Sequence, residues 1–354
     1  MRAVSARVLP ANHRSETPNR DVPCRLRYTG STNHSEDDMQ IGFNLPVSGP
    51  MADPHSMAKV AQLGESLGFD YLTTTDHVAL PDTSTPGYPY SESGEFYSPD
   101  PGHRVEQLTA TAWIAAKTDK IRLVLAILVV PYRPAVVTAK MLTTIDVLSG
   151  GRLTVGVGAG WLKPELEALS HTPFAERGAV TDEYIEAFKA IWTQERPVFH
   201  GKYTNLEGLL VDPKPVQKPH PPIWVGGETA PSLRRVARVG DAWYPIGTNS
   251  KHMLDTRPRL EAGIVRMRKM VAEAGRDPNS VGVVYRIKRH GFEAPPATDG
   301  NRRLFTGSIE AVIDDIHALK AMGVTAMDFD FEGREADKAM AEMRLFRDRV
   351  LAKL

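Results

Sequence analysis

The chain has 354 residues, 42% of them hydrophobic, so it is long enough for one large α/β barrel or two ordinary domains and too apolar to be a disordered protein. Lysine plus arginine equals aspartate plus glutamate at 43 each, which leaves no net field that would attract nucleic acid or an anionic membrane. The one cysteine, Cys24, excludes a disulfide within a single chain and a thiolate metal cluster.

The stretch 1–38 differs from the rest of the chain. It mixes Arg, Ser, Asn, Pro and Asp without a helical or strand period, so it cannot bury enough surface to offset its ordering entropy. It also lacks the apolar segment of a secretory signal, and no run of the chain approaches the roughly 18 apolar residues of a membrane span. We therefore expect a cytoplasmic protein with a disordered or non-native extension at 1–38 and one domain at 39–354. Removing the extension should leave melting temperature and activity unchanged.

From residue 39 to 117, apolar runs of strand length alternate with amphipathic segments of helix length. We expect strands at 40–46 and 71–76 and helices at 54–67 and 105–117. The stretch 77–104 between them is rich in Pro, Tyr, Ser and Gly, which predicts a long loop. Loops of that length are uncommon inside a compact domain and are often functional lids.

The segment 122–161 has the pattern of a strand, a helix and a second strand. The residues at helical spacing, which should face a core, are Val137, Met141, Ile145 and Leu148. The run Ser149-Gly150-Gly151 supplies the left-handed stop of this helix. The second strand is interrupted by Gly156, Gly158 and Gly160. Glycine weakens a strand, so its repeated use indicates that a ligand or another backbone comes close.

The remaining chain continues the alternation. We expect strands at 222–227, 242–246, 281–288 and 326–331, helices at 181–193, 231–239, 257–274, 308–322 and 335–350, and a short hairpin between 195 and 220. Thr181 is the expected N-cap of the first of these helices. Eight strands alternating with eight helices predict a (β/α)8 TIM barrel with two insertions, the loop after the second strand and the hairpin before the fifth. A doubly wound open sheet is the competing architecture.

In a barrel, the site is built from loops that follow the carboxyl ends of the strands. His77 follows the second strand and opens the long loop, where its imidazole could exchange a proton near neutral pH, although a histidine at a strand end is often structural. Gly226 and Gly227 precede a helix and could offer backbone N–H groups to an anion, although such turns need glycine in any case. The GVGAG stretch at 156–160 lacks the third glycine of a dinucleotide fingerprint. The histidine spacings predict no metal site.

Several segments taken together resemble a known family. They are GFDYLTTTDHVALP, the YPY turn at 88–90, LAILVVPYRPAVVTAKMLTTIDVLSGGRLTVGVGAGW, FAERGAVTDEYIEAFKAIW, PKPVQKPHPPIWVGG and RRVARVGDAWYP, in this order over about residues 39–350. The family they resemble is the luciferase-like flavin and deazaflavin oxidoreductases, and the resemblance is strongest to the branch that uses coenzyme F420. It implies a TIM barrel with the coenzyme ring in the barrel mouth.

The resemblance also implies roles for particular residues. His77 would be the catalytic residue beside the redox-active carbon, and Asp76 precedes it as in the F420 branch. The coenzyme-binding positions would be Asp76, a cis bond between Ala126 and Ile127, Val129, Gly158, Gly160, and the phosphate-holding Gly226 and Gly227. Asn44, Tyr88 and Trp161 would line the substrate pocket, and Arg133 and Lys163 are candidates to meet the acidic tail of the coenzyme.

Trp161 departs from the family's sugar-phosphate dehydrogenases, which carry a glutamate acid at this place. Tryptophan cannot transfer a proton, so that activity is not expected. With the aromatic residues of the long loop (Tyr88, Tyr90, Phe96 and Tyr97) it suits an apolar or planar substrate. The alternative is that these rings only pack the loop.

The resemblance therefore predicts an enzyme that transfers a hydride between C5 of F420 and a small organic substrate. One alternative is an FMN-dependent luciferase-like monooxygenase that uses reduced flavin and oxygen. Another is a non-catalytic protein that binds the deazaflavin or flavin. We expect a small-molecule substrate as the partner, with a homodimer possible as in other members of the family, and neither nucleic acid nor membrane.

Overall fold

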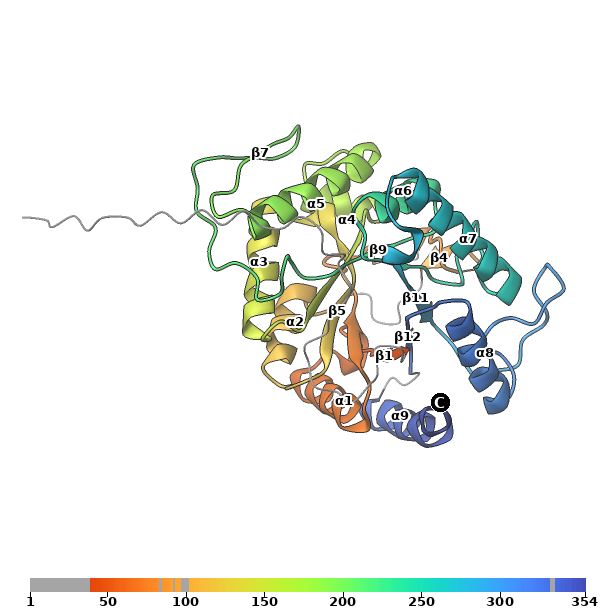
Figure 1. The fold of residues 1–354 in the computed structure, drawn as a ribbon. Coiled ribbons are helices and arrows are strands. Elements are labelled where there is room, and N and C mark those ends of the chain that lie inside the picture. Colours follow the sequence, from red (N-terminus) through yellow and green to blue (C-terminus); the bar gives the residue numbers. More distant parts are fainter. Residues whose placement is uncertain (1–38, 83–84, 92, 97–101, 332–334) are drawn as a thin grey trace, which may run out of the picture. The chain divides into compact units, whose positions relative to one another are not determined.

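Eight parallel strands close into a barrel in the computed structural model, which describes residues 39–354 except 83–84, 92, 97–101 and 332–334 (Figure 1). In chain order they are β1 (Gln40–Asn44), β2 (Tyr71–Thr74), β5 (Arg122–Val129), β6 (Leu153–Gly158), β9 (Ile223–Gly226), β10 (Ala242–Tyr244), β11 (Gly282–Ile287) and β12 (Ala326–Phe329). Each pairs with its neighbours in this order, and β12 pairs with β1. The predicted TIM barrel is confirmed, and the closed order excludes an open sheet. The extension at 1–38 lies outside the described residues.

The helices surround these strands (Figure 1). They are α1 (Pro54–Leu67), α2 (Gln107–Ala115), α3 (Ala135–Leu148), α4 (Lys163–Leu169), α5 (Arg177–Thr193), α6 (Ala230–Val239), α7 (Arg257–Glu273), α8 (Ile309–Ala321) and α9 (Ala336–Arg349). The periodicity does not predict α4. It also misplaces the start of α5, which begins at Arg177 because a 3-10 turn at Phe174–Glu176 leads directly into it. Thr181 is therefore not the N-cap; its hydroxyl donates to the Arg177 carbonyl within the helix (2.7 Å).

Local sequence explains where the helices begin and end. Asp53 caps α1 by accepting hydrogen bonds from the two following free amides, those of His55 and Ser56. Gly68 ends the helix with a φ of +86°, which glycine adopts without steric cost. Ser308 caps α8 as its sequence context predicts. These signals place most helix ends within a few residues of the expected positions.

The buried face of α3 differs from the expected one. Ile145 of the predicted stripe is buried and Met141 packs against the core, but Val137 and Leu148 are 53% and 64% exposed, so only half of the stripe faces the core. The buried residues are mostly small or polar: Ala135, Thr138, Ala139, Leu142, Thr143, Ile145 and Asp146. Small side chains let neighbouring elements come close, and the Trp192 indole of α5 donates to the Ala139 carbonyl (3.2 Å). The helix is thus oriented by close packing rather than by its largest apolar residues.

Two short antiparallel ribbons lie outside the barrel wall. β7 (Phe199–His200) pairs with β8 (Asn205–Leu206) and forms the expected hairpin before β9. β3 (Thr85–Pro86) pairs with β4 (Glu95–Phe96) inside the insertion that follows β2. The composition of 77–104 does not predict this second ribbon. The insertion therefore contains a folded element of its own.

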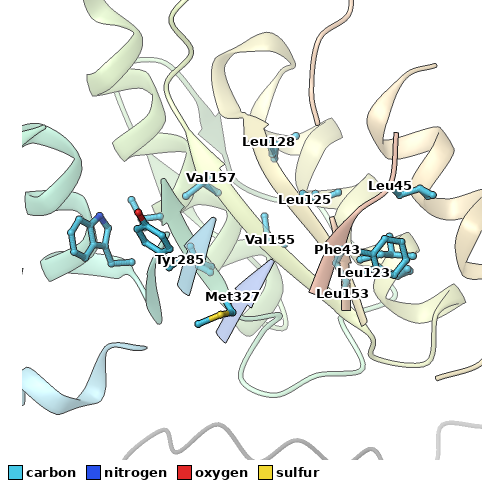
Figure 2. Close-up of a cluster of buried hydrophobic side chains, with 14 of the residues drawn as sticks. Phe43, Leu45, Leu123, Leu125, Leu128, Leu153, Val155, Val157, Tyr285 and Met327 are labelled. Atoms are coloured by element: carbon cyan, nitrogen blue, oxygen red, sulfur yellow. The ribbon is translucent and has the colours of Figure 1, made fainter. Parts of the chain in front are cut away.

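Side chains alternate between the two faces of the barrel wall. Leu153, Val155 and Val157 of β6 lie in the outer core beneath the helices, together with leucines of β5 such as Leu123 and Leu125 (Figure 2). The residues between them face the lumen. This outer core is the larger of the apolar clusters and holds the helices on the barrel.

The lumen contains a second apolar cluster, formed by Tyr71, Val124, Ala126, Trp224, Ala242, Tyr244, Val284 and Ala326, with Ile127 packed against it. The Trp224 ring lies 5.5 Å from the ring of Tyr71 and 5.8 Å from that of Tyr244. The interior of the barrel is therefore packed, as in other barrels of this type, and a ligand site must lie at the mouth.

Candidate active site at the carboxyl ends of the strands

His77 lies just beyond β2 and pairs with a carboxylate from another loop. Its Nδ1 is 2.7 Å from Oε2 of Glu165, in the first turn of α4. The same oxygen accepts a hydrogen bond from the Tyr132 hydroxyl (2.7 Å). The other oxygen, Oε1, accepts from the amides of Val78 (2.5 Å) and Ala79 (3.0 Å). Glu165 therefore anchors His77 and the start of the insertion to the end of β6.

The environment of Glu165 keeps its carboxylate ionised. Burial, the largest single influence, would raise the pKa of Glu165, since its side chain is fully buried. Hydrogen bonds from His77, Tyr132 and the Val78 amide outweigh burial, and the net result is a pKa below the ordinary value for glutamate. A buried negative charge thus lies directly behind the imidazole.

Asp76, just after β2, forms hydrogen bonds with residues at the end of β5 and in the segment that follows it. The Arg133 guanidinium binds both of its oxygens at 2.9 Å, and the Val129 amide donates to Oδ2 at 2.9 Å. Burial raises the pKa of Asp76, with the bonds from Arg133 and Val129 acting in the opposite direction. Arg133 also pairs with Glu106 (2.6 Å). Its charge therefore faces two carboxylates of the wall, and its expected role at the acidic coenzyme tail stays a prediction. Lys163 is exposed and lies 3.7 Å from Glu167.

The peptide bond between Ala126 and Ile127 is cis, as the resemblance implies. The pairing of β5 with β6 shifts register here, between Leu125 and Leu128. Ala126 and Ile127 both join the lumen cluster.

The glycines of β6 and β9 make room for Ile127. A Cβ on Gly158 would lie 1.9 Å from Cδ1 of Ile127, and a Cβ on Gly226 would lie 3.2 Å from its Cγ2. Gly160, with a φ of +80°, similarly leaves space for Val129, whose Cγ1 would be 2.7 Å from an added Cβ. The wall here therefore consists of one partly exposed apolar side chain lying across glycine backbone. We call this surface, formed by Ile127, Gly158 and Gly226, the Ile127 platform.

Gly226 is the last residue of β9, and Gly227, with a φ of +98°, begins the turn that leads to α6. The next residue, Glu228, is buried and accepts hydrogen bonds from the Ile246 amide (2.8 Å) and the Asn249 side chain (2.5 Å). Burial raises the pKa of Glu228 to about 7. The expected anion-binding turn therefore has a neighbouring carboxyl group that changes charge near neutral pH.

Aromatic side chains gather around His77. The Trp161 ring, just after β6, lies 5.1 Å from the ring of Tyr88 and 5.5 Å from that of Phe96. The His77 ring lies 5.3 Å from Phe96 and 6.4 Å from Trp161. The structure thus brings together His77 with Tyr88 and Trp161, two residues expected in the substrate pocket. We call the rings of Tyr88, Phe96 and Trp161 the aromatic cluster.

Asn44, the third expected pocket residue, lies at the end of β1 and accepts a 3.4 Å hydrogen bond from the Thr73 hydroxyl. The same hydroxyl is 3.2 Å from Arg286 of β11, which pairs with Asp328 at 2.9 Å. Asn44 therefore borders a buried polar network in the lumen. Tyr97, one of the expected loop aromatics, lies outside the described residues.

Sequence reasoning assigned no role to three residues of this region: Glu165, Glu228 and Lys288. Glu228 follows the glycine pair directly, so its position at a strand end was a usable signal. Lys288 likewise follows β11. Glu165 gave no comparable signal, because it lies beyond Trp161 in a helix that the periodicity does not show.

In the part of the chain that the structure describes, no group of three or more His, Cys, Asp or Glu side chains could hold a metal, and no helix is long and apolar enough to cross a bilayer.

Comparison with known proteins agrees with this architecture. The family model described as luciferase-like monooxygenase matches residues 39–292. The FMNH(2)-dependent dimethylsulfone monooxygenase of Pseudomonas putida is 31% identical over 308 residues, covering 75% of this chain and 80% of that protein. Monooxygenase RslO1 from Streptomyces bottropensis has a TM-score of 0.67 at 21% identity, covering 89% of this chain and 99% of that one. The coenzyme F420-dependent tetrahydromethanopterin reductase from Methanopyrus kandleri has a TM-score of 0.66 at 17% identity, with coverage of 89% and 99%. The chain belongs to the luciferase-like monooxygenase family.

Proposed function

We propose that this protein is an oxidoreductase that binds coenzyme F420 at the barrel mouth and moves a hydride between C5 of the deazaflavin and a small organic substrate. The observation that carries the proposal is the Ile127 platform on β5, β6 and β9 beside the end of β2, which His77 follows, since β2 pairs with β5. A flat ring needs an apolar surface, and a redox step coupled to proton transfer needs a group that can exchange a proton.

The residues present fit such a ring. Gly158 and Gly226 carry no side chain, so the Ile127 side chain is what covers the ends of β6 and β9. The phosphate of the coenzyme would meet backbone N–H groups at Gly226 and Gly227 and the amino end of α6. Support for the deazaflavin also comes from the resemblance of the Asp76-His77 junction to the F420 branch.

The chain's own groups would work as follows. When bound, the coenzyme supplies or accepts the hydride. The Ile127 platform orients its ring, and the aromatic cluster excludes water from the reacting atoms. His77 exchanges a proton with the substrate, while Glu165 holds the imidazole in place. Asp76 and Arg133 keep the ends of β2 and β5 together and so maintain the distance between His77 and the platform.

Spectral titration of the purified protein with oxidised F420, and separately with FMN, tests the proposal. We expect F420 to bind with a dissociation constant at least tenfold lower than that of FMN. The loaded protein should then exchange hydride with some member of a broad panel of alcohols, aldehydes and enones. Tight binding of FMN alone would overturn the choice of coenzyme.

The second candidate is a monooxygenase that uses reduced FMN and oxygen. The Pseudomonas putida relative, 31% identical to this chain, is described as FMNH(2)-dependent, and this favours the alternative. Oxygen uptake that depends on both reduced FMN and an organic substrate would establish it. Binding of either coenzyme without turnover of any acceptor would instead indicate a non-catalytic binding protein.

A further inference from the structure

We infer that Glu165 is a positioning residue that fixes His77 in one tautomer, with the ring proton on Nδ1 and the lone pair on Nε2. The inference rests on the proposed function in one respect, the use of Nε2 toward the substrate. The tautomer itself can be tested without any coenzyme.

The hydrogen-bond inventory of Glu165 leaves one consistent arrangement. At Oε1, the amides of Val78 and Ala79 can only donate. At Oε2, the Tyr132 hydroxyl and His77 Nδ1 are each 2.7 Å away. A carboxylate accepts at both oxygens and gives no proton. If the carboxyl group is ionised, Nδ1 of His77 must therefore carry a hydrogen and donate it.

The ionised form is the one that the surroundings favour. The pKa of Glu165 lies below its ordinary value because three kinds of donor compensate for burial: the imidazole, a phenol and a backbone amide. Removing water from the site strengthens each of these bonds. The carboxylate is consequently charged at neutral pH, and His77 Nδ1 is the donor.

The tautomer determines whether Nε2 of His77 can accept a proton from the substrate. With Nδ1 protonated, Nε2 has a free lone pair and can take a proton from a substrate O–H or N–H group. That group keeps the bonding electron pair, and the imidazole becomes a cation with a proton on each nitrogen. The charge of Glu165 stabilises this cation at 2.7 Å. When the reaction runs in reverse, Nε2 of the His77 cation returns this proton to the substrate. The opposite tautomer, with the proton on Nε2, could not accept a proton at that atom.

Nitrogen NMR on coenzyme-free protein tests the tautomer directly. Spectra of ring nitrogens labelled with 15N, recorded at roughly pH 8.5 where an ordinary imidazole is neutral, distinguish a protonated nitrogen from a bare one. The His77→Gln variant identifies the His77 signals among the 11 histidines. We expect Nδ1 protonated and Nε2 bare. A wild-type spectrum with Nε2 protonated overturns the inference without any variant.

Two substitutions separate positioning from packing. In Glu165→Gln the amide oxygen can still accept from Val78 and Ala79, while the amide nitrogen now donates to Nδ1, so the proton should move to Nε2. In Tyr132→Phe the carboxylate remains, so the proton should stay on Nδ1. If Glu165→Gln does not fold, the nitrogen spectra of the wild type and of Tyr132→Phe still test whether the ring proton is on Nδ1. An unchanged tautomer in folded Glu165→Gln overturns the inference.

Kinetics link the tautomer to turnover. Once a substrate is known, Glu165→Gln should lower kcat by roughly 10- to 10⁴-fold, the loss expected when a catalytic histidine is held in the wrong tautomer, with little change in KM. Glu167→Gln on the same helix is the matched control, since Glu167 is 51% exposed and pairs only with Lys163 among the described contacts. It should leave kcat and tautomer unchanged. If F420 does not bind but Nδ1 is protonated, the coenzyme proposal fails and the tautomer assignment stands.

Discussion

Lys288 donates a hydrogen bond to the Tyr88 hydroxyl at 2.8 Å and so joins the end of β11 to the insertion that leaves β2. In the closed strand order, β2 and β11 are separated by β1 and β12 on one side and by four strands on the other. The Ser250 amide, in the loop after β10, also donates to the Pro89 carbonyl (2.8 Å). The insertion therefore spans the mouth and is attached on its far side.

This attachment predicts that Lys288 slows ligand exchange. The Lys288 ammonium also lies 4.8 Å over the Tyr88 ring, and such a contact contributes roughly 0.5–1 kcal/mol. Lys288→Met should therefore raise the association and dissociation rate constants of F420 roughly fivefold, measured by stopped-flow fluorescence. Lys251→Met, an exposed lysine on the β10 loop, is the control. Weaker binding without faster association would mean that Lys288 contacts the ligand instead.

Two glycines of β6 should differ in their tolerance of a methyl group. A Cβ on Gly156 would lie 2.1 Å from the Leu125 carbonyl oxygen, which cannot move without disturbing the strand pair. A Cβ on Gly158 would meet only the end of the Ile127 side chain. We expect Gly156→Ala to lower the free energy of unfolding by about 3 kcal/mol and Gly158→Ala by about 1 kcal/mol. Chemical denaturation measures both.

The Ile127 platform provides an internal control for this comparison. Ile127→Val removes Cδ1, the atom nearest to a Cβ on Gly158. It should restore most of the stability lost in Gly158→Ala and none of that lost in Gly156→Ala. Equal recovery in both backgrounds would contradict the assignment of the contacts.

The barrel could be predicted because its signals are local. Apolar runs and helix stops such as Gly68 recur along the chain and need no knowledge of distant contacts. His77 and the pair Gly226-Gly227 could be predicted because a strand end already places them at the mouth. The same reasoning places Glu228 and Lys288 at the mouth, but it gives neither of them a role.

Features set by tertiary contacts could not be predicted in this way. α3 buries Ala139 and exposes Leu148, because its orientation depends on how closely α5 approaches. Glu165 is 88 positions from His77, and the two meet only when β2 and β6 lie on the same side of a closed barrel. Periodicity carries no information on such a pair.

His77 should be required for turnover but not for folding. Its ring is 14% exposed, packs on Phe96 and Trp161 and bonds to the buried Glu165 carboxylate, so His77→Ala should lower the melting temperature while the barrel still folds. Its loss should lower kcat by roughly 10²–10⁴-fold, as expected when a proton-transfer group is removed. F420 affinity, measured by titration, should remain within a few-fold. Undiminished turnover in a folded variant would remove His77 from the mechanism.

His290 should make the protein sensitive to acid. Its ring is packed among Phe329, Phe331 and Phe346 at 5.2–5.6 Å, and burial lowers the pKa of His290 to about 4 from an ordinary value of 6.5. Between pH 6.5 and 4 the unfolded chain binds a proton that the folded chain does not. Stability therefore falls as the pH is lowered through this window, by up to about 3 kcal/mol from this group.

Replacing the titrating ring should remove that loss. His290→Phe keeps an aromatic side chain among the three phenylalanines and cannot bind a proton. The difference in unfolding free energy between this variant and the wild type should grow in favour of the variant from pH 7 to pH 4, measured by urea denaturation at each pH. His55→Gln, an exposed position on α1, should follow the wild-type curve. Parallel curves for His290→Phe and the wild type would show that His290 is protonated equally in the folded and unfolded states, and that its burial has no influence on acid stability.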